Sequence, residues 1–113
     1  MMGLPETDVA RVQRWCRART PEQLRDEVRV EADVADRHVT IVECRPPWRE
    51  DFGPEWTRFP IARLRYVKTT GLWSLFWRDR HCKFHTYDRV PASANVEQLL
   101  AEVDRDPTAI FWG

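Results

Sequence analysis

Apolar residues near the start of the chain recur at helical spacing. Between Thr7 and Arg19 they fall every three or four residues, and arginines take the opposite side. This pattern predicts an amphipathic helix. Thr20-Pro21 then combines a capping residue with a proline at a first helical position, which predicts a short extra turn ending near Asp26.

A second helix is predicted near the end of the chain. Its apolar residues stand at i, i+3, i+4 and i+7 from Val96 to Val103, directly after Asn95, a favourable N-cap residue. We expect Asp106-Pro107 to end it. The closing run Ile110-Phe111-Trp112 is apolar, so we expect it to dock on the core or on a sheet edge.

Two segments in the first half of the chain alternate apolar and polar residues with the period of a strand. The segments 28–34 and 39–44, joined by a short turn, predict an antiparallel hairpin. Pro46 and Pro47 stop the second strand. The segment from there to Pro60 is rich in proline and predicts a packed irregular loop without regular structure.

Three further strands are predicted at 61–67, 72–78 and 83–87, forming a three-stranded meander. In the middle strand both faces are largely apolar, which predicts a central strand covered on both sides. The sequence thus predicts one α+β domain spanning residues 1–113. Its antiparallel sheet of about five strands, a hairpin plus the meander, packs with an N-terminal and a C-terminal helix.

Composition narrows the class of protein. The 113 residues suffice for one core, and 18 basic against 18 acidic residues leave no global field toward nucleic acid or lipid. No apolar run could span a membrane, and no secretory signal is evident, which predicts a cytoplasmic protein. The three cysteines lack close spacing, so we expect reduced, buried thiols.

Three runs carry a resemblance to a known family: IVECRPPWR at 41–49, TTGLWSLFWRD at 69–79 and KFHTYD at 83–88. Together they resemble an uncharacterised bacterial family, the domain of unknown function numbered 3024. The resemblance covers nearly the whole chain and implies an intact domain. It brings no reaction, cofactor or site residue with it.

Basic residues interleaved with aromatic ones suggest an anion-binding or nucleic-acid-binding face. Arg63 and Arg65 project from one side of a predicted strand, and Arg78 and Lys83 stand near the next turn. Exposed aromatic rings stack on bases while guanidinium groups hold phosphates. The competing interpretation is an ordinary solvated face in which these arginines pair with acidic residues. Those acids are Glu43, Glu55, Asp79 and Asp88.

The proline-rich loop is a second candidate binding element. Its tryptophans and arginines are of the types that dominate protein interfaces, and long loops without regular structure are uncommon unless functional. The residues concerned are Arg45, Trp48, Arg49 and Trp56. The alternative is a lid in which the tryptophans plug a small core. A binding role requires both tryptophans to be at least partly exposed.

Catalysis or metal binding is the alternative class of function. Cys82 and His85 are suitable zinc ligands, but a strand places them on opposite faces, and no paired metal motif accompanies them. His85 and Asp88, with Glu43 nearby, are candidates for a general acid–base pair. A histidine on a strand is more often a packing residue.

The sequence therefore favours a non-catalytic binding or interaction module without a cofactor, as a monomer or a homodimer. The partner is either a protein or a single-stranded nucleic acid. The alternative is a small enzyme or metal protein that uses His85, Asp88 and Cys82.

Overall fold

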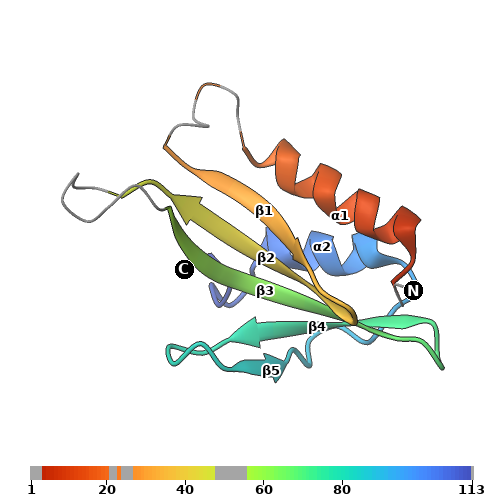
Figure 1. The fold of residues 1–113 in the computed structure, drawn as a ribbon. Helices are drawn as coiled ribbons and strands as arrows, with labels where there is room; N and C mark the ends of the chain where they lie inside the picture. The colour runs from red at the N-terminus through yellow and green to blue at the C-terminus, as the bar shows by residue number, and fades with distance from the viewer. Residues whose placement is uncertain (1–3, 21–22, 24–26, 48–55, 113) are drawn as a thin grey trace.

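The computed structural model describes residues 4–20, 23, 27–47 and 56–112, and Figure 1 shows their arrangement. An N-terminal helix is followed by five strands and a C-terminal helix, an α+β fold as the sequence predicts. The elements are α1 (Glu6–Ala18), β1 (Arg29–Val34), β2 (His38–Arg45), β3 (Thr57–Val67), β4 (Leu72–Arg78), β5 (Phe84–Thr86) and α2 (Val96–Arg105). The extra turn predicted after Thr20 falls mostly outside the described residues.

All five strands belong to one antiparallel sheet in the order β1-β2-β3-β4-β5. Each strand pairs with its neighbour in the sequence, so the predicted hairpin and meander are joined by pairing between β2 and β3 (Figure 1). The β3–β4 turn contains Gly71 at φ +69°, a conformation that glycine adopts without steric cost.

The prediction of irregular structure up to Pro60 is wrong for its last residues, because β3 begins at Thr57. Proline is tolerated here because β4 pairs with β3 only from Ala62 onward, so no described strand pairs with β3 at Pro60 on that side. The pairing with β2 also shifts at this point: Ile41 faces Ala62 and Val42 faces Pro60, which leaves Ile61 as an extra residue.

Both helices cover the same face of the sheet. α1 contacts β1 and α2, while α2 also contacts β4, and Figure 1 shows the two helices side by side. Their apolar stripes meet one side of the strands, where Trp73 and Leu75 are completely or almost completely buried. The other helical and strand residues of this core are Val9, Val12, Cys16, Val30, Val39, Ile41, Ile61, Ala62, Leu64, Val96, Leu99, Leu100 and Val103.

The expectation that β4 is covered on both sides is wrong in the described part of the chain. Trp73 and Leu75 face the helices, but Leu72, Ser74 and Phe76 on the opposite face are only half-buried. An apolar side chain on a strand can remain half-exposed when its neighbours cover its flanks. The sheet therefore presents one face that no described helix covers.

Two buried hydrogen bonds tie the helices to the sheet. The indole N–H of Trp73 donates to Asp8 Oδ2 at 2.9 Å, and the Tyr87 hydroxyl donates to Glu102 Oε2 at 2.7 Å. Since each carboxylate is on a helix, these bonds satisfy buried polar atoms and fix the position of α1 and α2.

The end of the chain follows the sequence prediction. Asn95 caps α2 by accepting from the backbone N–H of Glu97 at 3.1 Å. Asp106 ends the helix in a left-handed conformation, and its carboxylate accepts the backbone N–H groups of Phe111 and Trp112, both at 2.9 Å. These bonds bring Phe111 into the core, where it is 4% exposed, so the apolar terminus is docked as expected.

The expectation of buried cysteines holds for Cys16 and Cys44 and is wrong for Cys82. Cys82 lies at the β4–β5 turn with φ +64°, so its position is set by the turn and not by packing. Burial raises the pKa of the Cys16 thiol to about 12, which leaves it protonated and unreactive at neutral pH.

Candidate functional site

The face of the sheet opposite the helices carries basic and aromatic side chains from its last three strands. Side chains alternate along β3, so Arg63 and Arg65 lie on this face, as the sequence alternation predicts. Their partners on β4 are Phe76 and Ser74. We call this surface the open face; its residues on these strands are Arg63, Arg65, Ser74, Phe76, Arg78, Phe84 and Thr86.

Arg63 is held in a defined position at the centre of the open face. Its Nε donates to Thr40 Oγ1 at 3.0 Å, and its guanidinium carbon lies over the Phe84 ring, 4.0 Å from the centroid. Burial lowers the pKa of Arg63, and the charge of Asp33 opposes that shift. The guanidinium is thus partly desolvated, and its two terminal nitrogens have no hydrogen-bond partner among the described residues.

No carboxylate within the described residues forms an ion pair with Arg63, Arg65 or Arg78. Arg65 is exposed. Arg78 lies over the Phe59 ring at 4.0 Å and donates to two backbone carbonyls, those of Pro60 at 2.7 Å and Asp79 at 2.9 Å. Of the acids suggested as partners, Glu43 pairs with Arg45 and Asp79 with His85, while Glu55 lies outside the described residues.

His38 is a neighbour of this site that sequence reasoning missed. It faces Arg65 across the β2–β3 pair and lies on the same side as Thr40. Desolvation and the nearby charges of Arg63 and Arg65 lower its pKa, while Asp33 acts in the opposite sense. Only the pairing register brings His38 to the arginines, and a sequence alone does not contain that register.

The other predicted binding residues are dispersed. Arg45 donates to Glu43 at 2.8 Å at the end of β2, and Lys83 is exposed in the β4–β5 turn. Trp56 is partly exposed, as a binding role requires, and the Arg29 guanidinium lies over its ring at 4.1 Å. Trp48 and Arg49 lie outside the described residues, so their role stays a prediction.

The candidate catalytic residues do not form a shared site. His85 Nε2 pairs with Asp79 at 2.8 Å, and not with Asp88. Glu43 is on β2, with β3 and β4 between it and His85. The Asp79 carboxylate also accepts the backbone N–H groups of His81 and Lys83 at 2.8 and 2.9 Å.

These bonds close the β4–β5 turn, and they explain why the pKa of Asp79 falls to about 2: its bond from His85 contributes most, followed by the bond from Lys83. A carboxylate that begins a tight turn is an ordinary structural device, so the Asp79–His85 pair has a sufficient structural explanation. Within the described residues, no cluster of three or more His, Cys, Asp or Glu side chains could hold a metal ion, Cys82 and His85 included.

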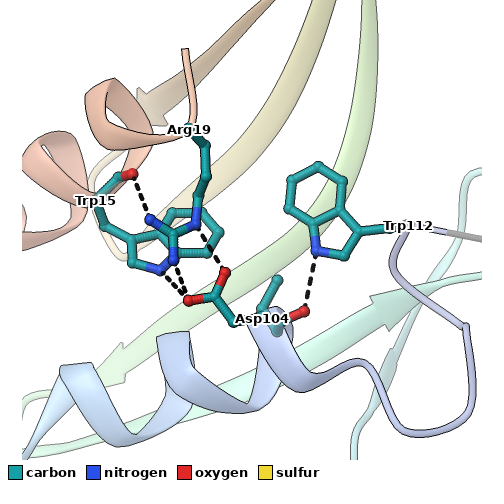
Figure 2. A network of polar contacts seen from close by, with 5 residues as sticks. Trp15, Arg19, Asp104 and Trp112 are labelled. Carbon is teal, nitrogen blue, oxygen red and sulfur yellow. Dashed lines mark hydrogen bonds and ion pairs between the residues drawn. The ribbon is translucent and has the colours of Figure 1, made fainter. Parts of the chain in front are cut away.

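The outer surface of the two helices carries a further polar network, which Figure 2 shows in detail. The Arg19 guanidinium lies over the Trp15 ring at 4.0 Å and donates through Nε to Asp104 Oδ1 at 2.7 Å and through Nη2 to Asp104 Oδ2. Arg19 Nη1 donates to the Trp15 carbonyl and the Trp15 indole N–H to Asp104, both at 3.2 Å. We call Trp15, Arg19 and Asp104 the helix clasp.

A cavity of about 320 Å³ lies beside the helix clasp, between α1 and α2. Two of the three arginines that line it are already paired, Arg19 with Asp104 and Arg11 with Asp8 at 2.9 Å. Because these charges are largely neutralised inside the protein, the network fits a role in fixing α1 against α2.

These features define an α+β protein whose sheet is covered by helices on one face and carries, on the other, arginines that form no ion pair with any described carboxylate. The chain belongs to the family described as a domain of unknown function, DUF3024, which matches residues 3–113. Comparison with curated proteins and with solved structures found no significant match. In the described part of the chain, no helix is both long and apolar enough to cross a membrane.

Proposed function

We propose that this protein is a non-catalytic binding module that holds an anionic ligand on the open face of its sheet. The observation that carries the proposal is the position of Arg63 and Arg65, side by side on one strand without an ion-pair partner in the described part of the chain. The zero net charge of the chain does not oppose this proposal, because salt screens distant charges and an anion in contact with the protein interacts mainly with the charges beside it.

The environment of Arg63 gives a reason for a ligand to bind there. A cation that burial has partly stripped of water is less stable than one in solvent, as the lowered pKa of Arg63 reflects. An anion beside it restores the lost stabilisation through charge-assisted hydrogen bonds to the terminal nitrogens. A single exposed ion pair contributes only about 0–1 kcal/mol, so useful affinity needs several contacts and therefore a polyanion.

Binding of inorganic polyphosphate tests the proposal, because this ligand has charge and no other recognition feature. We expect calorimetric titration at low salt to show binding that weakens as salt rises. Arg63→Gln and Arg65→Gln should each weaken binding and reduce the salt slope by about 1.

Arg14→Gln is the matched control. Arg14 is an exposed arginine of α1 without an ion pair among the described residues, on the side of the molecule that carries the helices. The substitution removes the same charge from the chain. Equal losses in Arg14→Gln and Arg63→Gln would attribute binding to overall charge and reject the open face as the site.

A further inference from the structure

We propose that the anion bound by the open face is a single-stranded nucleic acid, with a base stacked on the Arg63 guanidinium and phosphates on Arg65 and Arg78. This inference rests on the proposed function and names its ligand. It follows from how aromatic rings and guanidinium groups are combined on this side of the sheet.

Arg63 is prepared for stacking before any ligand arrives. The Phe84 ring supports one side of its guanidinium, and the bond to Thr40 fixes Nε. A long, flexible side chain normally loses conformational entropy on binding, and a side chain that is already held loses less. Guanidinium planes stack on nucleic-acid bases as aromatic rings do, so Arg63 offers a platform for a base.

The helix clasp contains a second arginine that lies over an aromatic ring, and this arginine binds a carboxylate. In the helix clasp, the Arg19 guanidinium lies over Trp15 at 4.0 Å, and the Asp104 carboxylate occupies its outward edge (Figure 2). Arg63 lies over Phe84 at the same 4.0 Å, but no described carboxylate occupies its edge. Because the Nε of Arg63 already donates to Thr40, we expect an anion from outside to bind the terminal nitrogens of Arg63, where Asp104 binds Nη2 of Arg19.

The surroundings of Arg63 favour a nucleic acid over a simple polyphosphate. The Arg78 guanidinium likewise lies over an aromatic ring, that of Phe59, which is 46% exposed but faces Glu43 and so lies on the other side of β3. Phe76 is half-buried directly opposite Arg63. A polyphosphate would use only the charges, whereas a nucleic acid supplies both phosphates and flat apolar rings.

A single strand fits this surface better than a duplex. The bases of a duplex are stacked on each other and are not available to an arginine on a sheet face, whereas those of a single strand are. Arg65 lies two residues from Arg63, about 7 Å along the strand, so it reaches the backbone next to a base on Arg63.

The test separates bases from phosphates. Fluorescence anisotropy compares a deoxythymidine strand of about ten nucleotides, within the usual site size of one small domain, with an abasic strand of equal length and charge. We expect the thymidine strand to bind about tenfold more tightly. A duplex of the same length and a polyglutamate peptide of the same charge should both bind more weakly than the thymidine strand.

The variant Arg63→Lys keeps the charge and removes the planar platform. We expect it to bind the abasic strand within about threefold of wild type and to lose most of the preference for thymidine. Phe84→Leu, which removes the supporting ring, should have the same effect. Arg14→Lys on α1 is the control and should change neither affinity.

The outcomes distinguish this inference from the function on which it rests. Equal affinity for the thymidine and abasic strands overturns the inference and leaves polyanion binding intact. A duplex or polyglutamate that binds as tightly as the thymidine strand overturns the choice of a single strand. Loss of binding to all polyanions, polyphosphate included, rejects the proposed function itself. An Arg63→Lys variant that keeps the full thymidine preference rejects the platform role.

Discussion

The bond between Tyr87 and Glu102 should make a measurable contribution to stability. Tyr87→Phe removes the hydroxyl that donates to Glu102 at 2.7 Å, and keeps the ring that packs 5.1 Å from Phe111. Hydrogen bonds to charged groups contribute about 1.5–3 kcal/mol. Glu102 keeps an ion pair with exposed Arg105 at 3.6 Å, which softens the loss, so we expect about 2 kcal/mol.

Thermal and urea unfolding measure this loss, and for a chain of this size it lowers Tm by roughly 8 °C. Tyr66→Phe is the matched control: Tyr66 is half-buried and packs on Trp73 at 5.1 Å, but its hydroxyl has no hydrogen bond within the described residues. The control should change stability by less than about 0.5 kcal/mol. Equal effects of the two substitutions would refute the argument.

Alkaline pH gives an independent check on the same bond. Burial, followed by the bond to Glu102 and the charge of that carboxylate, raises the pKa of Tyr87 to about 12. A folded pKa above the ordinary value means that this contribution is complete below about pH 10 and is lost as the pH rises through about 12. The stability difference between wild type and Tyr87→Phe should therefore be constant up to about pH 9 and shrink above it.

Three other groups give further predictions. The pKa of His38 is lowered in the free protein, and a polyanion on the open face should raise it. Polyphosphate affinity, measured by calorimetric titration, should therefore rise between about pH 8 and about pH 6, and His38→Gln should not show this rise in affinity. Asp79→Asn should lower Tm at neutral pH. Wild type should lose stability as acid protonates Asp79 between about pH 4 and its pKa of about 2, and the variant should lose less over this range; an equal loss in both proteins would contradict this. Asp106→Ala should cost about 2 kcal/mol in urea unfolding, because it removes the carboxylate that accepts the N–H groups of Phe111 and Trp112. It also places alanine at φ +41°, a left-handed conformation that aspartate tolerates better, and Trp112 fluorescence should report release of the terminus.

Most elements of the fold were predictable because their signals are local. Helical spacing with Asn95 as a cap predicts α2, and period-two alternation predicts four of the strands at nearly their observed bounds. The start of β3 was missed because Pro60 is a strong local signal against a strand. Proline is acceptable there because no described strand pairs with β3 at that position on the β4 side.

The candidate site was predictable only in part, because only some of its features have local signals in the sequence. Alternation alone places Arg63 and Arg65 on one face, but whether they have partners depends on pairing between distant strands. His38 reaches Arg65 through the β2–β3 register, and Phe84 reaches Arg63 across β4. Likewise, Asp79 and not Asp88 pairs with His85, because the turn conformation folds Asp79 back on the strand.

The extra residue Ile61 keeps Arg58 and Arg63 on the same face of β3. Arg58 and Arg63 are five positions apart and would lie on opposite faces of a regular strand, yet Arg58 faces Cys44 and Arg63 faces Thr40, two residues on one side of β2. Side-chain replacements at Ile61 change only local packing. Removal of the residue would invert one half of the strand relative to the other and turn Arg58 toward the helices. We therefore expect the number of residues between Arg58 and Arg63 to be under stricter evolutionary constraint than their identity.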